Sequence, residues 1–294
     1  MKGLFIILIA FGLPKTYTQV KTQKEIAFVT NRDGNSEIYL MDNKGENLRN
    51  ITNNKFLDFS PSWNPNGKGL FFYSKRDGNA EIYSMRTDGK NILRHTYHPS
   101  TDVLPSLSPD GKHVVFMSER DSISRNVFIM NFDGSNLKQL TRNELYEESP
   151  DWSPDGKQII FTRQLQDSTE TSHVANGEIH IMDSDGKNVK RLTFKDGYDS
   201  GAKFSSDGKK IAFYGVHNKQ WDIYIMDSDG KNVYNLTDDT IECYSPDWSP
   251  NNEWIVYTAG AKGNYNIWKI NVTTKERIQL TNTPGRNEEP VWKK

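Results

Sequence analysis

Acidic side chains recur at one position of a repeated segment, and grouped carboxylates can attract cations or basic groups. Six threonines are each followed, nine residues later, by a proline or its equivalent, and the position of interest lies three residues before it. The residues at this position are Asp58, Asp102, Glu147, Asp199, Cys243 and Asn287. If the six copies surround one axis, four carboxylates lie at one height and produce a focused negative field. We therefore take these six residues as candidates for partner or ion binding at the rim of a channel.

A structural role for the same residues stays open. An Asp at the entry to a strand often accepts hydrogen bonds from the backbone N–H groups of its own loop. A second acidic or amide position also recurs sixfold, and this regularity favours a scaffolding role for its residues, which are Glu37, Glu81, Asn126, Glu178, Asp222 and Asn266. A nucleophilic role for Cys243 would need an activating base, and the sequence indicates none.

The elements that position these residues form a repeat. Short β-branched and aromatic runs begin at residues 26, 70, 114, 159, 211 and 255, which are 44, 44, 45, 52 and 44 residues apart. Each repeat contains a second such run, a turn, a third strand and a final strand such as Ser245–Trp248. The turn is Asp-Gly in four repeats, as at Asp229-Gly230, with Lys44-Gly45 as a variant. A period in the forties with strands and turns in this order predicts an all-β, six-bladed β-propeller of four-stranded antiparallel blades.

Proline indicates which strand is innermost. Pro61 stands two residues before Trp63, and the same spacing recurs in most repeats. A proline cannot donate to a β-ladder, so it belongs on an edge strand, here the one that lines the channel. The chain enters at the second strand of a blade and stops after a first strand. We therefore expect residues 26–52 and 288–292 to share one sheet and close the ring.

The repeat resembles that of TolB-type propellers. The resemblance is carried by Pro150-Asp-Trp152 followed by Ser153–Lys157, then Glu178–Asp183, Asp185-Gly186 and Arg191-Leu-Thr193, and it covers about residues 26–292. It implies a periplasmic protein whose propeller binds a protein, as TolB binds the lipoprotein Pal. Similar repeats build oligogalacturonate lyases and the propellers of prolyl oligopeptidase-like peptidases. The α/β domain expected of TolB is not found before the first strand, and no Gly-x-Ser-x-Gly motif supports a peptidase.

Composition limits the partners and the compartment. The formal charge is −1 over 294 residues, so no basic face for nucleic acid is expected. Residues 1–18 have the features of a signal peptide, with Lys2 ahead of an apolar run that is too short to span a bilayer. We expect residues 19–294 to form one domain that is periplasmic or secreted. With a single Cys, no intrachain disulfide can form, and we expect a monomer without a cofactor.

Two classes of function stay open at this stage. The first is a non-catalytic binding scaffold for a protein or a cell-envelope glycan. The second is a propeller-type polysaccharide lyase or hydrolase that could depend on a divalent cation, which would require clustered metal ligands, whereas the six histidines are scattered along the chain. The fourth repeat is longer than the others because of the segment 164–177, and an insertion on a rigid scaffold often carries recognition.

Overall fold

The structure is a computed structural model that describes residues 25–121, 124–165, 176–194, 197–217, 219–238 and 240–294. The predicted signal peptide, residues 1–18, lies outside the described residues. So do residues 166–175, which make up most of the predicted insertion 164–177.

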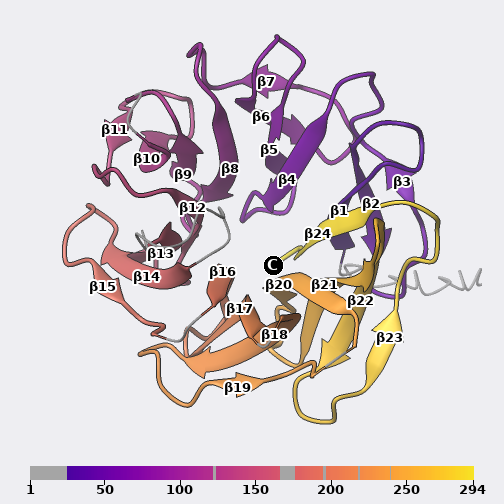
Figure 1. The fold of residues 1–294 in the computed structure, drawn as a ribbon. Helices are drawn as coiled ribbons and strands as arrows, with labels where there is room; N and C mark the ends of the chain where they lie inside the picture. The colour runs from indigo at the N-terminus through magenta and orange to yellow at the C-terminus, as the bar shows by residue number, and fades with distance from the viewer. Residues whose placement is uncertain (1–24, 122–123, 166–175, 195–196, 218, 239) are drawn as a thin grey trace, which may run out of the picture.

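The described residues form six four-stranded antiparallel sheets, arranged as blades around a central axis (Figure 1). Blade 1 contains, from the axis outward, β24 (Asn287–Trp292), β1 (Glu25–Thr30), β2 (Glu37–Asp42) and β3 (Arg49–Asn50). Blade 2 contains β4 (Asp58–Trp63), β5 (Gly69–Ser74), β6 (Glu81–Arg86) and β7 (Leu93–Arg94). Blade 3 contains β8 (Asp102–Leu107), β9 (His113–Ser118), β10 (Asn126–Asn131) and β11 (Lys138–Gln139).

The remaining three blades have the same strand order. Blade 4 contains β12 (Glu147–Trp152), β13 (Gln158–Gln164), β14 (Gly177–Asp183) and β15 (Lys190–Arg191). Blade 5 contains β16 (Tyr198–Phe204), β17 (Lys210–His217), β18 (Gln220–Asp227) and β19 (Tyr234–Asn235). Blade 6 contains β20 (Glu242–Trp248), β21 (Trp254–Ala261), β22 (Asn264–Asn271) and β23 (Arg277–Gln279). The predicted six-bladed propeller is confirmed.

The two ends of the described chain close the ring, as the sequence predicts. The innermost strand β24 pairs antiparallel with β1, so that Ile26 lies opposite Trp292 and Thr30 lies opposite Asn287. Phe28 and Trp292 are almost fully buried in a cluster that also contains residues of blade 6. The contact between blades 6 and 1 is therefore packed like an ordinary part of the core.

Each innermost strand is interrupted by a bulge at the predicted proline. The residue before the proline has a positive φ, 51° at Ser60 and 53° at Ser149, and Gly201 has 62° in blade 5, where the proline is absent. The pairing register shifts at the same place, for example between Phe59 and Ser62. The bulge bends the strand next to the axis, which is a position where bulges commonly redirect side chains.

Tryptophans at the ends of the innermost strands connect neighbouring blades. The indole Nε1 of Trp152 donates to the carbonyl of Ser106 at 3.1 Å, in the preceding blade. Trp63 donates in the same way to Val291, and Trp248 to Lys203. These buried tryptophans thus also form a specific hydrogen bond between blades.

The Asp-Gly turns also connect neighbouring blades. Gly89 has a φ of 75°, and a Cβ placed on it would lie 2.6 Å from the carbonyl oxygen of Ile51 in blade 1. Glycine is therefore needed for its backbone conformation and for the close approach of two backbones. Corresponding contacts with the preceding blade occur at Gly45, Gly134, Gly186 and Gly230.

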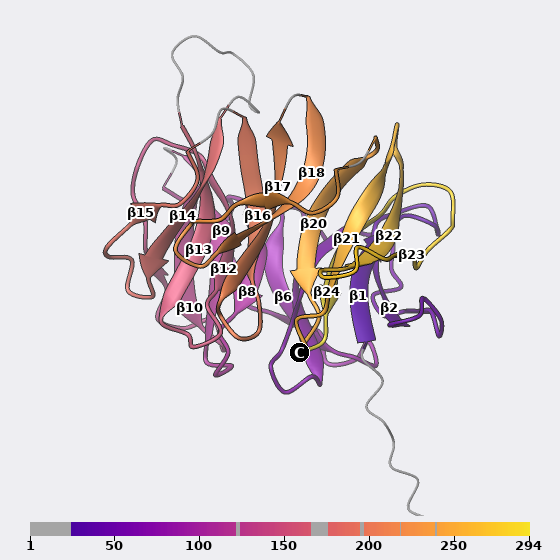
Figure 2. The same ribbon diagram turned by 90° about the horizontal axis from the view of Figure 1, so that it is seen from below.

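The blades differ in the length of their middle strands. In blades 5 and 6 the two middle strands have eight residues each, whereas in blades 1 to 3 they have six. Figure 2 shows the ring from its side, with the hairpin of β17 and β18 at the upper end and the C-terminus at the lower end. We use "upper end" and "lower end" in this sense below.

Candidate functional site

The six residues singled out by the repeat lie together at the upper end of the innermost strands. Each is the first or second residue of its strand. Their side chains are not open to solvent, because every one of the six residues is at most 2% exposed. The structure thus brings them to one height in the ring, as predicted, but buries them within the blades.

Three of the six residues bind an arginine of their own blade, a fourth binds a histidine, and a fifth binds an arginine through an amide. Arg76 lies 3.0 Å from Asp58, Arg120 lies 2.6 Å from Asp102, and Arg163 lies 2.6 Å from Glu147. His217 lies 3.1 Å from Asp199, and Arg32 donates to Asn287 at 2.9 Å. Cys243 contacts the carbonyl of Ile241. Most of the negative charge expected at the rim is therefore compensated inside each blade.

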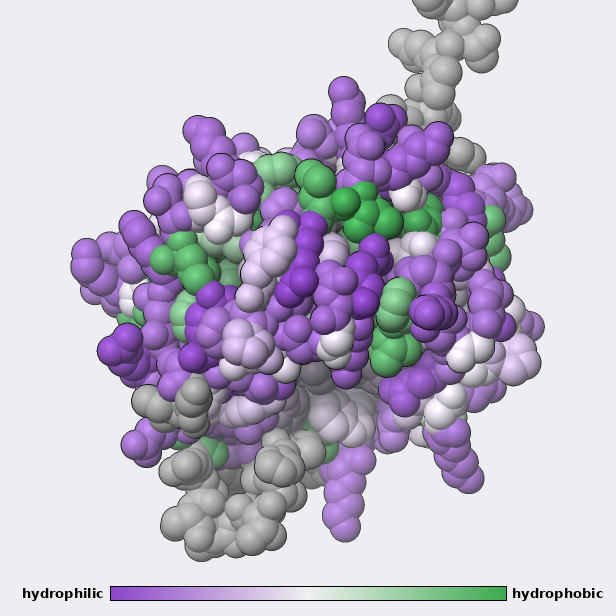
Figure 3. Space-filling model, turned by 90° about the horizontal axis from the view of Figure 1, so that it is seen from above, coloured by the Kyte–Doolittle hydropathy of each residue, from purple (hydrophilic) through white to green (hydrophobic). Residues whose placement is uncertain are grey.

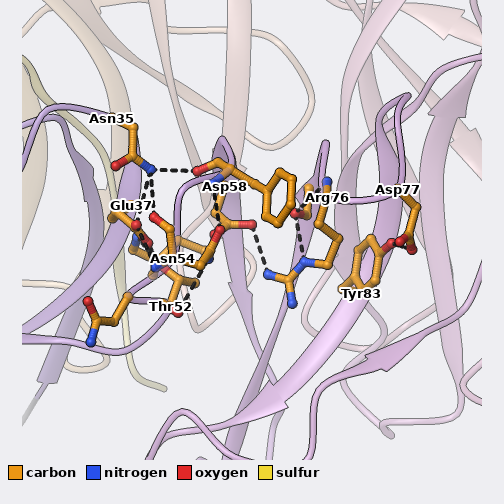
Figure 4. Close-up of polar contacts among 12 residues, drawn as sticks. Asn35, Glu37, Thr52, Asn54, Asp58, Arg76, Asp77 and Tyr83 are labelled. Atoms are coloured by element: carbon orange, nitrogen blue, oxygen red, sulfur yellow. Dashed lines mark hydrogen bonds and ion pairs between the residues drawn. The ribbon is translucent and has the colours of Figure 1, made fainter.

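The arginines are held from a second side by aromatic rings. The guanidinium of Arg76 lies 4.8 Å from the centre of the Tyr83 ring, while its nitrogens bind Asp58 and the hydroxyl of Ser74 (Figure 4). Arg32 and Arg120 lie over Tyr39 and Phe128 in the same way. Removing the acid would leave a confined arginine without its partner, which is costly in a partly desolvated place.

The second repeated polar position belongs to the same scaffold. The hydroxyl of Thr52 donates to Glu37 and accepts from the backbone N–H of Ile38, and Asn54 donates from its backbone to Glu37 and from its side chain to Asp58 (Figure 4). The threonine-to-backbone bond recurs in all six blades at 2.8–3.0 Å, from Thr52, Thr96, Thr141, Thr193, Thr237 and Thr281. This geometry supports a fold-holding role for both sets of residues. Partner binding by the residues at the start of the innermost strands, Asp58 and its equivalents, stays a prediction.

A cavity of about 530 Å³ occupies the channel below these residues, and all six innermost strands line it. Its wall extends from the bulges, at Ser60 and Glu289, to the turns at the lower end, at Pro65 and Pro154. A concave site of this size, walled by side chains from every blade, suits a ligand or an inserted segment of a partner.

Opposite charges face this cavity near its lower mouth. Asp151 accepts from the hydroxyl of Ser106 at 2.6 Å and lies 3.0 Å from the ammonium of Lys203. Asp247 accepts from the backbone N–H of Trp292 and lies 3.4 Å from Lys294. The lysine side chains retain partial exposure, 26% for Lys203 and 45% for Lys294. The two lysines and Asp151, which is 14% exposed, are therefore reachable from the channel, whereas Asp247 is buried like the acids at the upper end.

Two carboxyl groups face the middle of the channel. Burial raises the pKa of Glu148, whose carboxylate accepts from Ser200 at 3.0 Å. Burial also raises the pKa of Glu289, which accepts from the backbone N–H and the hydroxyl of Ser60. Burial and the negative charge of both groups raise the pKa of the Tyr214 hydroxyl. The middle of the channel thus combines carboxyl and hydroxyl groups that can donate and accept hydrogen bonds.

Sequence reasoning missed these channel residues although one signal was present. The position immediately after the proline or its equivalent carries Ser62, Ser106, Asp151, Lys203, Asp247 and Val291. This position varies strongly while its neighbours repeat. Variation on a repeated scaffold is expected where a residue faces a ligand space rather than the core.

Among the described residues, no group of three or more His, Cys, Asp or Glu side chains is arranged to hold a metal ion. His180 packs on the ring of Phe161, and its burial lowers the pKa of the imidazole to about 4. It lies in the core. No helix among the described residues is long and apolar enough to cross a membrane.

Comparison with known proteins places this geometry in a family. A family model described as TolB beta propeller domain matches residues 21–178 and 171–294. The Tol-Pal system protein TolB of Geobacter sulfurreducens is 46% identical over 46 residues, which are 16% of this chain and 11% of that protein. The chain therefore matches only a small part of that relative's length.

Solved structures agree on the fold. TolB from Acinetobacter baumannii superposes with a TM-score of 0.77 at 25% identity, over 92% of this chain and 66% of that chain. An oligogalacturonate lyase in complex with manganese superposes with a TM-score of 0.62 at 13% identity, over 87% of this chain and 73% of that chain. At such low identity the second similarity concerns the fold alone.

Proposed function

The chain belongs to the TolB β-propeller family, and from this premise we propose that it is an exported, non-catalytic binding scaffold for a protein or a cell-envelope glycan. The observation that carries the proposal is the cavity of about 530 Å³ lined by all six innermost strands. Its wall is held by bonds between blades, so the site is formed before the partner arrives. Preorganisation of this kind reduces the entropy lost on binding.

The chemistry of the cavity supports a polar partner. Asp151 and Lys203 face it from neighbouring blades, and Asp247 and Lys294 face it near the closure of the ring. Polar or charged groups of a partner can exchange with the partly exposed lysines of these pairs, Lys203 and Lys294. The hydroxyl and carboxyl groups at mid-channel offer further hydrogen bonds.

Capture with matched variants tests this proposal. The purified propeller is immobilised and exposed to a cell-envelope extract, and bound proteins and glycans are identified by mass spectrometry. The double variant Asp151→Asn with Asp247→Asn changes two channel charges. Its control, Asp185→Asn with Asp229→Asn, removes the same charge from two outer turns where both carboxylates are 55% exposed. We expect the partner to be lost with the channel variant only, and equal capture by both variants would contradict the proposal.

Export and a monomeric state are parts of the same proposal. A curated relative belongs to the Tol-Pal system, and residues 1–18 have the features of a signal peptide. N-terminal sequencing of the mature protein after cell fractionation tests export, and an uncleaved cytoplasmic protein would oppose it.

The outermost strands are only two or three residues long, which gives little edge for pairing with another copy. Figure 3 shows one side of the ring, where hydrophobic residues are interspersed among hydrophilic ones. The molar mass in solution, measured by light scattering, tests the monomeric state.

A further inference from the structure

The junction between blades 4 and 5 carries a histidine where the three preceding junctions carry an arginine. We define this junction as Glu178, Arg191, Asp199 and His217. In blades 2, 3 and 4 an arginine binds the buried acid at the start of the innermost strand. In blade 5 a histidine does so, and its Nε2 lies 3.1 Å from Asp199. An arginine keeps its charge at all physiological pH values, whereas a histidine changes charge near neutrality.

The histidine occupies the same place as the arginines. Its ring centre lies 4.8 Å from that of Tyr224, and the Arg76 guanidinium lies 4.8 Å from the ring of the equivalent Tyr83. Both side chains therefore lie between a buried acid and an aromatic ring. The side chain of His217 is 17% exposed and that of Asp199 is 3% exposed, so their interaction is weakly screened by solvent.

The charges around this place favour the protonated imidazole. From β14, Glu178 acts electrostatically on Asp199, and Arg191 in β15 pairs with Glu178 at 2.5 Å. Burial raises the pKa of the Tyr224 hydroxyl, and Asp222 in β18 and Asp238 in the loop after β19, together with Asp199, raise it further by their negative charge. The remaining titratable neighbours are His180 in β14, which stays neutral near pH 7 because its pKa is about 4, and Tyr214 and Tyr198. The two arginines nearby are both paired with an acid, Arg191 with Glu178 and Arg163 with Glu147.

We propose that His217 makes the junction between blades 4 and 5 pH-sensitive, so that it tightens below neutral pH and loosens above it. The imidazolium forms an ion pair with the buried Asp199. The neutral imidazole offers at most one uncharged hydrogen bond, which leaves a nearly buried carboxylate poorly compensated.

Glu178 acts with the same sign. Burial raises its pKa from 4.5 to about 6, above the value in the unfolded chain. A carboxyl group with a raised folded-state pKa stabilises the fold while it is protonated, and this contribution is lost as the pH rises through about 6. Both groups therefore loosen the junction as the pH rises, and the experiment must separate them.

The looser packing should affect the start of β14. A Cβ placed on Gly177 would lie 2.6 Å from the ring of Tyr198, so the first residue of β14 packs directly against the first residue of β16. The bond between His217 and Asp199 lies within blade 5 and acts on this contact through Tyr198, the neighbour of Asp199 in β16, so weakening the bond should loosen the packing of Tyr198 on Gly177.

Hydrogen exchange read by mass spectrometry tests the proposal. Protection of residues 177–183 is measured at pH 5.5 and 8.0 and corrected for the intrinsic pH dependence of exchange. We expect about tenfold more protection at pH 5.5, the equivalent of one pKa unit of coupling. Residues 81–86 lie at the junction where Arg120 binds Asp102, and they serve as the internal control without this change.

Variants separate the two titrating groups. His217→Arg installs the permanent cation of blades 2 and 3 and should abolish the pH dependence while keeping the low-pH protection. His217→Gln should give the high-pH behaviour at both pH values and serves if the arginine variant does not fold. Unchanged pH dependence in these variants, together with its loss in Glu178→Gln, would overturn the assignment to His217. Wild-type protection that does not vary with pH would overturn it as well.

Discussion

The two ends of the innermost strands use charge in opposite ways. At the upper end, Asp58 and its counterparts are buried and bound by cations of their own blade. At the lower end, Asp151 and Lys203 come from neighbouring blades and face a cavity. The upper position is acidic in four of the six blades, while the lower position carries serine, aspartate, lysine or valine. Regular repetition therefore marks the scaffold in this molecule, and variation marks the surface available to a partner.

The largest expected effect concerns closure, on which both ends depend. Deleting residues 287–294 removes β24, leaves β1 without its inner neighbour and exposes the cluster around Phe28. Loss of Trp292 alone should cost about 3–5 kcal/mol, as do other large aromatic truncations in cores. Thermal unfolding monitored by circular dichroism measures the effect. An unchanged melting temperature would contradict the closed ring.

The next effect tests the scaffold at the upper end. Asp58→Asn leaves Arg76 without its counter-charge in a site where the guanidinium is 16% exposed. Breaking a buried pair by removing one partner costs about 3–5 kcal/mol. Asp88→Asn in the same blade is the control, since its pair with Arg86 is exposed and should contribute at most about 1 kcal/mol. Urea unfolding of both variants checks the difference, and equal stabilities would refute the scaffold role.

A smaller effect tests the contact between blades at an Asp-Gly turn. Gly89→Ala should be more destabilising than Gly111→Ala, although the two glycines have similar φ values of 75° and 70°. At Gly111 nothing lies within 4 Å of the added Cβ, so only the backbone strain of about 1–2 kcal/mol remains. At Gly89 the carbonyl of Ile51 must also move, which should add about 1–3 kcal/mol. Equal losses in urea unfolding would show that the blades do not meet tightly here.

Sequence alone predicts the scaffold well because its signals are local and repeated. The spacing of strands and turns predicts the blades, and Pro61 and its equivalents predict which strand lies inside. The burial of Asp58 is harder to predict because its partner Arg76 lies 18 residues further along the chain. The sequence does contain a signal for this partner, because Arg32, Arg76 and Arg120 recur at one position of the repeat.

The cavity could not be predicted in the same way. Asp151 and Lys203 come from different repeats and meet only because the blades surround one axis. No local pattern encodes the space between six strands, because its size depends on the ring as a whole. The raised pKa of Glu148 likewise arises from burial in that shared space.

One measurement on two single-charge variants tests the central claim that the upper end holds the fold and the lower end binds. Melting temperature and affinity for the captured partner are determined for Asp58→Asn and Asp151→Asn, at a temperature where both are folded. We predict that Asp58→Asn lowers the melting temperature by about 5–9 °C and leaves the affinity unchanged. We predict that Asp151→Asn weakens binding with a change of about 2 °C or less. Lost affinity in folded Asp58→Asn, together with unchanged affinity in Asp151→Asn, would contradict the account and place the binding site at the upper end.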